Sequence, residues 1–277
     1  MPAEEEALDA ERHNLSQINR LNQRGGRTLS IIDLIEDGTV TAEMAAFCWL
    51  AVSGGTSFMT GAVPGGVGKT TLMAALLSFL PPGEPIVTVS DRRVIEGAAQ
   101  ARSDGPLTVL AHEIGAGRWF GYIWGRDAAD YFALTRQGVR CVTCLHADSP
   151  EQSRASLSPL GVTADDFARV RLQLYMLAER RGPRVLRRVR SLHFGLDGPH
   201  QDCYRWQAAD DRFSRDAAGE DLCALLAAQL GVPREGASRC WQRCEQWLQD
   251  WQSEGVRRFE DVRERIVAAY DGWPPGD

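Results

Sequence analysis

The feature that most constrains this chain is a glycine-rich segment, GAVPGGVGKTT, at residues 61–71. A β-prone run, Ser57–Ala62, leads into it, and Thr70–Leu80 has the composition of a helix that ends at the following Pro-Pro-Gly. The segment departs by one residue from the pattern G-x-x-x-x-G-K-[ST], because Val63 stands where the first glycine belongs. A strand, a glycine loop and a helix in this order predict a mixed α/β fold.

The loop residues carry the chemistry expected of a phosphate site. In such a loop, backbone N–H groups surround the phosphate oxygens, and the following helix points the positive end of its dipole at them. Lys69 would reach the β- and γ-phosphates, and the Thr70 hydroxyl would bind Mg²⁺. The expected ligands are therefore ATP and Mg²⁺. The predicted nucleotide-binding residues are Pro64, Gly65, Gly66, Val67, Gly68, Lys69, Thr70 and Thr71.

Two observations favour a working site despite Val63. Lys69 is the single lysine among 31 lysine and arginine residues, so the chain keeps a compact ammonium at this one place. Val63 precedes Pro64, and a residue before proline is restricted to extended angles in which valine is comfortable. We therefore predict an extended entry at Val63, a turn at Gly65-Gly66 and preserved phosphate binding.

Apolar runs beyond the loop extend the α/β prediction. Pro85–Ser90, Leu107–Ala111 and Val139–Leu145 are typical of buried parallel strands, and a helix over Arg126–Gln137 fits before the last of them. Two antiparallel strands are predicted next, at Val185–Phe194 and Cys203–Gln207, joined through a turn at Asp197-Gly198-Pro199. The chain looks helical from Arg215 onward, with leucine and tryptophan stripes that are typical of a core.

The sequence divides into three predicted regions. Residues 1–52 form a helical lead, in which residues 1–12 are frayed, residues 53–207 form the α/β core, and residues 208–277 form a helical appendage. The predicted helices of the lead are Asn14–Asn22, Ile31–Glu36 and Ala42–Val52.

Composition excludes several classes of protein. A net charge of −6 argues against general nucleic-acid binding. The longest apolar runs, Ala45–Val52 and Leu72–Leu77, are far shorter than the roughly 18 residues of a membrane span, and the acidic N-terminus does not resemble a signal peptide. Seven cysteines, an odd number, fit reduced thiols. We expect a cytoplasmic, globular protein without membrane insertion.

Three further segments resemble motifs of one protein family. IVTVSD at Ile86–Asp91 is similar to its acidic box, TVLAHE at Thr108–Glu113 to its Walker B strand, and CLHADSP at Cys144–Pro150 to its histidine box. With the segment Thr28–Gly61 and the glycine loop, they make residues Ser30–Arg190 resemble the traffic ATPases of type II and type IV secretion, pilus assembly and retraction, and archaeal flagellum motors.

This resemblance implies a P-loop NTPase core of the RecA-like type, a mostly parallel sheet flanked by helices. It also implies roles beside that of Lys69. Glu113 would polarise the water that attacks the γ-phosphate, His146 would sense that phosphate, and Asp91 would lie near Mg²⁺ or the water. The implied activity is ATP hydrolysis that drives conformational work on a protein partner.

The chain also departs from the family, which leaves alternatives open. Ser90 replaces a glutamate, His112 replaces the glycine before Glu113, and GAGRWFGYIWG is inserted at Gly115–Gly125. One alternative is a nucleotide-binding switch with little hydrolysis; another is a P-loop kinase that uses the insertion as a lid. The family's separate N-terminal domain has no counterpart in the roughly sixty residues before the loop. A homo-oligomer is thus compatible with the sequence but not implied.

No arginine matches the one that follows Walker B in the family. The candidates for stabilising the transition-state charge are Arg92, Arg93, Arg126 and Arg140, unranked by sequence. The arginine-rich run Arg180–Arg190 is typical of a solvated hairpin face, although an acidic partner or a membrane surface would also suit it.

Cys141, Cys144 and His146 have a spacing that looks like a metal site. In a strand, however, residues three apart point to opposite faces. We therefore interpret the two cysteines as buried thiols.

Overall fold

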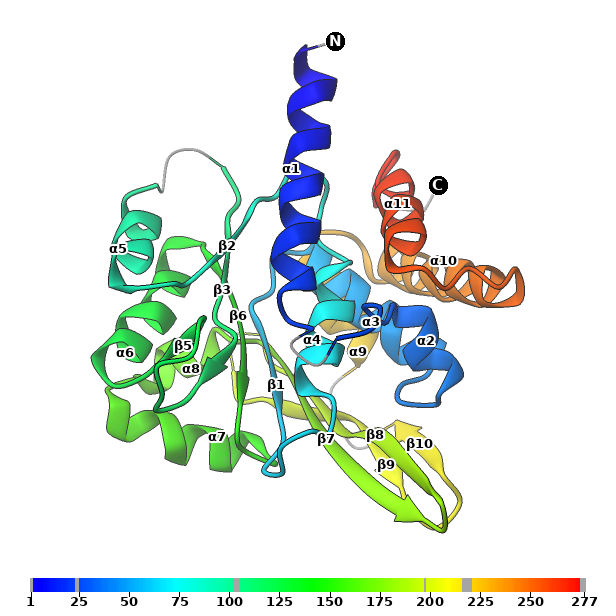
Figure 1. Cartoon of the computed structure of the whole chain (residues 1–277). Coiled ribbons are helices and arrows are strands. Elements are labelled where there is room, and N and C mark those ends of the chain that lie inside the picture. The colour runs from blue at the N-terminus through cyan, green and yellow to red at the C-terminus, as the bar shows by residue number, and fades with distance from the viewer. Residues whose placement is uncertain (1, 23–24, 102–104, 197, 216–220, 275–277) are drawn as a thin grey trace.

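The computed structural model describes residues 2–22, 25–101, 105–196, 198–215 and 221–274, with side chains from residue 9 onward. A central sheet lies between two layers of helices (Figure 1). Its strands are β1 (Phe58–Gly61), β2 (Ile86–Thr88), β3 (Thr108–Leu110), β4 (Glu113–Ile114), β5 (Tyr122–Ile123), β6 (Arg140–Leu145), β7 (Leu172–Arg181), β8 (Arg184–Phe194), β9 (Gln201–Gln207) and β10 (Arg212–Arg215).

The strand order along the sheet is β10-β9-β8-β7-β1-β6-β3-β2, with β4 and β5 beside the end of β6. The five strands from β7 to β2 pair in parallel, and β7 to β10 pair antiparallel as a meander. The predicted fold class, a mixed α/β fold with a mostly parallel sheet flanked by helices, is confirmed.

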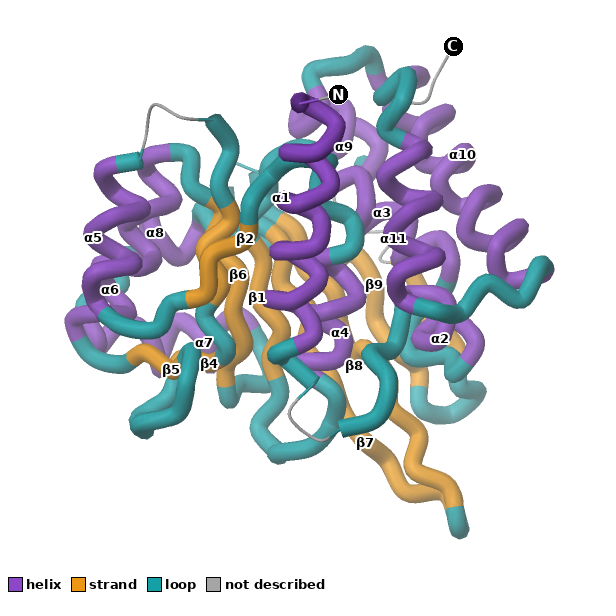
Figure 2. Tube along the Cα trace, turned by 45° about the horizontal axis from the view of Figure 1, so that its top comes forward, coloured by secondary structure: helices purple, strands orange, loops and turns teal. Residues whose placement is uncertain are grey.

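Helices cover both faces of the sheet (Figure 2). The α-helices are α1 (Pro2–Asn19), α2 (Ile31–Glu36), α3 (Ala42–Ser53), α4 (Lys69–Leu77), α5 (Arg92–Gln100), α6 (Arg126–Ala133), α7 (Pro150–Leu157), α8 (Ala164–Ala168), α9 (Leu222–Leu230), α10 (Arg234–Ser253) and α11 (Phe259–Ala269). The layer of α5 to α8 lies on one side, and α1 to α4 with α9 to α11 lie on the other.

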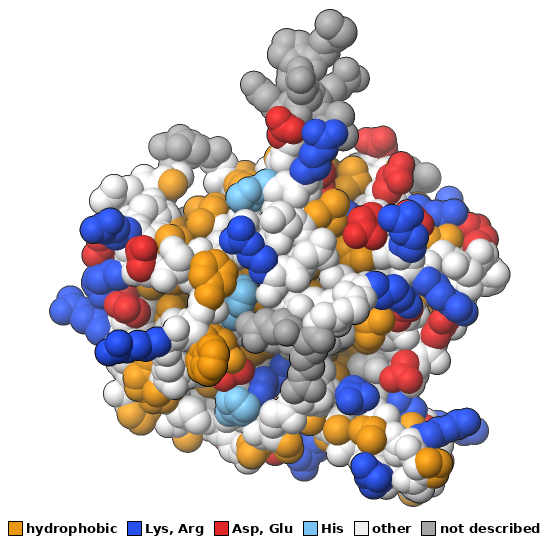
Figure 3. All heavy atoms as spheres, viewed as in Figure 1, with side chains coloured by type: hydrophobic (Ala, Val, Ile, Leu, Met, Phe, Trp, Pro, Cys, Tyr) orange, Lys and Arg blue, Asp and Glu red, His pale blue; other side chains and the backbone are white. Residues whose placement is uncertain are grey.

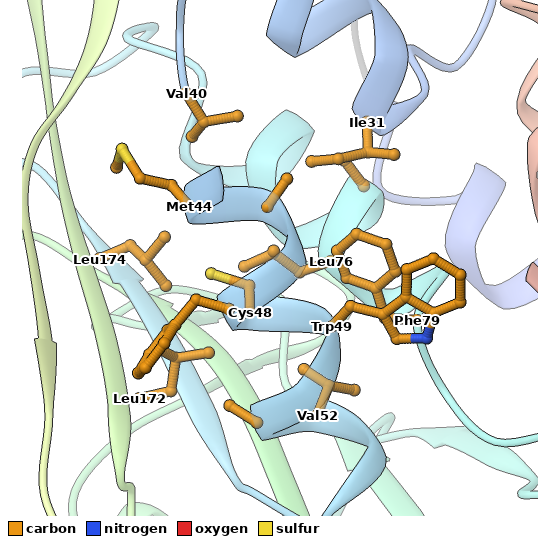
Figure 4. Close-up of a cluster of buried hydrophobic side chains, with 14 of the residues drawn as sticks. Ile31, Val40, Met44, Cys48, Trp49, Val52, Leu76, Phe79, Leu172 and Leu174 are labelled. Carbon is orange, nitrogen blue, oxygen red and sulfur yellow. The ribbon is translucent and has the colours of Figure 1, made fainter. Parts of the chain in front are cut away.

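Alternation along the strands divides the core between these two layers, because successive side chains of a strand point to opposite faces. In β1, Phe58 belongs to the larger hydrophobic cluster, which includes α3, α4 and the C-terminal helices, whereas Met59 belongs to the cluster under α5 to α8. In Figure 4 the indole of Trp49 lies against Phe79, and their rings are stacked 5.3 Å apart. The sheet is thus buried on both faces, as its continuous apolar strands predict.

The elements of the lead agree with the sequence except at its start. The prediction that residues 1–12 are frayed is wrong for residues 2–12, because α1 begins at Pro2. Its first turns are rich in Ala and Glu, which are strong helix formers, and proline is tolerated at a first helical position. The far half of α1 is fixed to the sheet, since Asn14 donates to Glu84 O (2.9 Å) and accepts from Ile86 N (2.8 Å). The helix ends at Asn19, three residues before the predicted end.

The remaining predicted elements are present. The hairpin strands and the C-terminal helices are confirmed, and Trp241 and Trp251 are buried as their spacing predicts. Within the predicted turn, Asp197 lies outside the described residues. The short strands β4, β5 and β10 were not predicted, because two to four residues carry too little pattern to stand out from a loop. The ten-residue strand β7 was not predicted either.

The larger hydrophobic cluster joins residues from all three predicted regions: Trp49 from the lead, Leu172 from the sheet and Leu248 from the C-terminal helices are among its members. The boundaries at residues 52 and 207 remain predictions. Over the residues that can be described, no helix is both long enough and apolar enough to cross a membrane.

Candidate phosphate-binding site

The glycine loop joins β1 to α4 at the carboxyl edge of the parallel strands. Gly66 and Gly68 adopt φ angles of +80° and +108°, which side chains resist, whereas Val63 is outside this left-handed region and its side chain is 51% exposed. The turn lies at Gly65-Gly66, as predicted. Gly68 caps α4 without any side-chain hydrogen bond to the first turn. The N–H groups of that turn therefore lack a side-chain acceptor from the cap.

The entry of the loop is held by the segment after β6. Val63 N–H donates to Asp148 Oδ1 (2.7 Å), and the Nδ1 atom of His146 lies 2.9 Å from Val63 O. Both backbone groups of Val63 thus have partners in the histidine-box segment. A valine can therefore stand here, since side chains of the segment after β6 hold its backbone in place. The Asp148 contact was missed at the sequence level, although the residue lies within the quoted CLHADSP motif.

Lys69 is buried in the first turn of α4, with a relative exposure of 7%. Its Nζ donates to Ala62 O at 3.2 Å and lies 3.4 Å from Nδ1 of His146. The Thr60 hydroxyl donates to Lys69 O at 3.1 Å, which ties the start of the helix back to β1. The ammonium therefore lies between the two ends of the loop, with Thr70 next along the helix.

Glu113 follows β3 and has two neighbours. Its Oε1 lies 3.1 Å from Nε2 of His146, and Tyr122 is the residue opposite Glu113 where β5 pairs with β4. Burial, followed by the charge of Glu113, raises the pKa of Tyr122. Both ring nitrogens of His146 thus face acceptor oxygens, Val63 O and Glu113, and a neutral ring can donate to only one of them.

The insertion between β4 and α6 explains how Tyr122 comes to Glu113. The chain folds back after Trp119, so that Gly121 O accepts from His112 N (2.7 Å) and β5 pairs with β4. The His112 ring is buried against Gly121 and lies edge-on to Phe120, at 5.4 Å between centroids. His112 therefore packs against the two residues, Phe120 and Gly121, at which the insertion folds back. The quoted insertion contains Tyr122, but nothing in its pattern pointed to a contact with Glu113.

Asp91 is not brought to the loop. It lies beyond β2, three strands from β1, or about 14 Å at the usual strand spacing. Its carboxylate caps α5 by accepting from Arg93 N at 2.8 Å. The structure thus brings together Lys69, His146 and Glu113 and leaves Asp91 apart; its role near Mg²⁺ remains a prediction.

The four arginine candidates also lie elsewhere. Arg140 begins β6, at the end opposite His146, where its buried guanidinium pairs with Glu84 at 2.8 Å and donates to Val52 O. Arg92 pairs with two aspartates of α6, at 2.7 Å each. Arg93 and Arg126 lie on α5 and α6, which pack against each other. None of the four contacts a described residue of the loop in this structure.

The two cysteines of β6 lie on opposite faces, as predicted. Cys141 Sγ donates to Tyr131 O on the α6 side, whereas Cys144 Sγ lies 3.0 Å from Thr60 Oγ1 and 3.7 Å from Met73 Sδ on the α4 side. Burial raises the pKa of Cys144 to about 12 and that of Cys141 as well, so both are held as thiols.

Comparison with known proteins gives one similar sequence and one similar solved structure to report. No family model matches it. It is 26% identical over 232 residues to the uncharacterized protein MJ1287 of Methanocaldococcus jannaschii, an alignment that covers 72% of this chain and 83% of that protein. Among solved structures it is similar to the Legionella pneumophila ATPase DotB, with 13% identity over 79% of this chain and a TM-score of 0.37. The chain spans 62% of the DotB chain. A likeness at that TM-score identifies neither the fold nor the function.

Proposed function

We propose that the chain is a P-loop ATPase of the RecA-like type, which binds ATP with Mg²⁺ at residues 64–71 and hydrolyses it. The observation that carries the proposal is the convergence of Lys69, His146 and Glu113 at the loop before α4. An ammonium, a helix N-terminus without a side-chain cap and a carboxylate beside them are parts that phosphoryl transfer to water uses.

The residues present fit a phosphate chain. Gly66 and Gly68 already hold the left-handed angles of the loop, and the first turn of α4 has no side-chain cap, so phosphate oxygens can accept from its N–H groups. Lys69 Nζ would exchange its contact with Ala62 O for phosphate oxygens. Mg²⁺ would be held by the Thr70 hydroxyl and would neutralise charge on the phosphates.

Glu113 is placed to orient water. Glu113 begins β4, where Tyr122 of β5 lies opposite it, and its Oε1 lies 3.1 Å from His146 Nε2, so the carboxylate has a partner before water arrives. His146 also contacts Val63 O and approaches Lys69. It thereby links the loop entry, the phosphate-binding cation and the carboxylate, which supports its predicted role as a sensor of the γ-phosphate.

The predicted mechanical role on a protein partner is part of this proposal. β7 and β8 pass beside the loop and form a hairpin that projects from the body of the molecule (Figure 1). Gly68 lies against Met176 of this hairpin, so a rearrangement of the loop on binding nucleotide has a direct contact through which to move it. The partner's identity and any assembly of several copies are left to experiment.

The test is a steady-state phosphate-release assay with Mg²⁺ and ATP, accompanied by calorimetric titration with an ATP analogue that is not hydrolysed. Lys69→Ala is expected to abolish detectable binding. Glu113→Gln is expected to retain binding and to lower kcat by about 10²-fold or more, because it removes a general base. The matched control is Glu179→Gln, an exposed carboxylate on β7 that pairs with Arg181, which should keep both properties.

Three outcomes would contradict the proposal in different ways. Absence of binding by the parent chain would remove the nucleotide site altogether. Tight binding with phosphate release no faster than that of Glu113→Gln would leave a nucleotide switch. Transfer of the phosphate to an added acceptor would identify a kinase instead.

A further inference from the structure

The predicted site has little positive charge for its ligand. Lys69 is its one cation from α4, whereas a nucleoside triphosphate brings several negative charges, and the carboxylates of Glu113 and Asp148 lie at the same edge. None of the arginines proposed from the sequence contacts the loop. Beside the Mg²⁺ of the proposed site, further positive charge would have to come from another element of the chain.

The strand β8 supplies arginines at this edge. Figure 3 shows basic side chains gathered over the hairpin of β7 and β8. Arg187 pairs across the sheet with Ala178, so it projects on the same face as Met176, two residues earlier on β7. A Cβ at Gly68 would lie 3.4 Å from Met176 Cε and 3.6 Å from Arg187 Cδ. The aliphatic part of the Arg187 side chain thus lies directly beside the glycine that begins α4.

The guanidinium of Arg187 is exposed and forms no ion pair with another residue that the structure describes. Its neighbour in sequence behaves differently: Arg188 is buried, pairs with Asp211 at 2.8 Å and donates to Asp37 O at 2.8 Å. Arg188 therefore holds the hairpin against the body, while Arg187 keeps its donors available beside the loop.

A β-bulge brings a second arginine to the same edge. Ser191 pairs with Tyr175 and Val189 with Met176, so Arg190 is an extra residue in β8. In a regular strand Arg187 and Arg190 would point to opposite faces; a bulge changes the direction of the side chains that follow it. Nη1 of Arg190 lies 4.0 Å from Oδ2 of Asp148, whose other oxygen accepts from Val63 N. Arg190 thereby offsets the one carboxylate that touches the loop backbone.

We propose that Arg187 contacts the phosphates of the bound nucleotide from the same chain, with Arg190 as the counter-charge of Asp148. The inference rests on the proposed function, since it names a further residue of that site. Because Arg187 lies beside Gly68, where the loop's N–H groups surround the α- and β-phosphates, its contact is with those phosphates and is made to ADP as well as to ATP.

The test is calorimetric titration of the full chain with ADP and with a non-hydrolysable ATP analogue, in the presence of Mg²⁺. Arg187→Gln is expected to weaken both by about tenfold, as the loss of a hydrogen bond between charged groups predicts. Arg187→Lys keeps the charge and should fall between this variant and the parent. Arg184→Gln is the matched control. Arg184 is exposed on the same strand, but it lies at the tip of the hairpin, where it is opposite Arg181 in the strand pairing.

The results separate this inference from the function on which it rests. A parent chain that binds neither nucleotide would refute the proposed function. A parent that binds both, with Arg187→Gln binding as tightly as Arg184→Gln, would refute the role of Arg187 and leave the function intact. Far-UV circular dichroism and a thermal melt of each variant show whether the exposed substitution has left the fold unchanged.

Discussion

At the scale of single residues, two of the departures in the motifs, Val63 and His112, have packing explanations. Val63 replaces the first glycine of the loop, and His146 and Asp148 hold both of its backbone groups. His112 replaces the glycine before Glu113 and fills the space beneath the insertion. For Val63 the sequence indicated an extended backbone, because proline follows it, but not the contacts with His146 and Asp148. It could not indicate the packing of His112, since the contacts of His112 come from a segment that folds back only in three dimensions.

His112 makes the stability depend on pH. Its ring is buried, and neither ring nitrogen has a hydrogen-bond partner among the described residues. Burial, with a smaller effect from the charge of Arg20, lowers its pKa from 6.5 to about 4. The unfolded chain therefore binds the proton more tightly than the folded one. The resulting stability is complete above pH 6.5 and is lost as the pH falls towards 4.

Between pH 7 and pH 5, the free energy of unfolding of the parent should fall by about 1–2 kcal/mol more than that of His112→Leu. The measurement is urea unfolding at both pH values, which yields the free energy of unfolding of each protein. Comparing the two proteins cancels the contribution of His193, whose pKa burial also lowers to about 4. Equal losses in parent and variant would show that His112 does not titrate in this range.

At the scale of elements, most segments with a sustained pattern were predictable and the shortest strands were not. The strands β1, β2, β3 and β6 and the C-terminal helices follow from apolar runs and helical spacing, whereas the ten-residue strand β7 was missed. The insertion Gly115–Gly125 gave no such pattern, and its strand β5 has two residues. Its place is set by close packing, because a Cβ at Gly121 would lie 2.5 Å from His112 Cγ. That contact also decides where Tyr122 meets Glu113.

Gly121→Ala should consequently damage the proposed catalysis through packing. The φ angle of Gly121 is +78°, and the added methyl group would displace His112 and with it the turn that carries Tyr122. We expect a destabilisation of about 2–4 kcal/mol, from left-handed strain and overpacking together. Phosphate release should fall about tenfold or more relative to the control, since the carboxylate loses its fixed position.

The control is Gly125→Ala. Gly125 ends the same insertion at a φ of +61°, but nothing lies within 4 Å of its added Cβ, so this variant carries the strain without the clash. Thermal melts give the stability of both variants, and the phosphate-release assay gives their activity. If the two alanines reduce stability and activity equally, the packing of His112 on Gly121 has no part in placing Glu113.

At the scale of the whole molecule, the sequence pattern predicted the three regions but not that the first and the last pack into one core. Trp49 of the lead stacks on Phe79 after α4 and also contacts Trp251 of α10, at 5.9 Å between centroids. The predicted regions 1–52 and 208–277 thus cover the same face of the sheet. Periodicity identifies which face of a helix is apolar, but the partner of that face is set by tertiary packing alone.

This shared core predicts that the described regions unfold together. Leu248 of α10 is fully buried in the larger hydrophobic cluster. Leu248→Ala should lower the free energy of unfolding by about 2–5 kcal/mol, through lost burial and the cavity left behind. Four of the eight tryptophans lie at Trp241 or beyond, so tryptophan fluorescence reports partly on the C-terminal region, whereas far-UV circular dichroism reports on all elements. Coincident melts of the parent, shifted together in the variant, are the expected result. Val185→Ala, an exposed change on the hairpin, should shift neither. Two separate transitions, with only the fluorescence melt moved by Leu248→Ala, would instead show that the C-terminal helices form an independent unit.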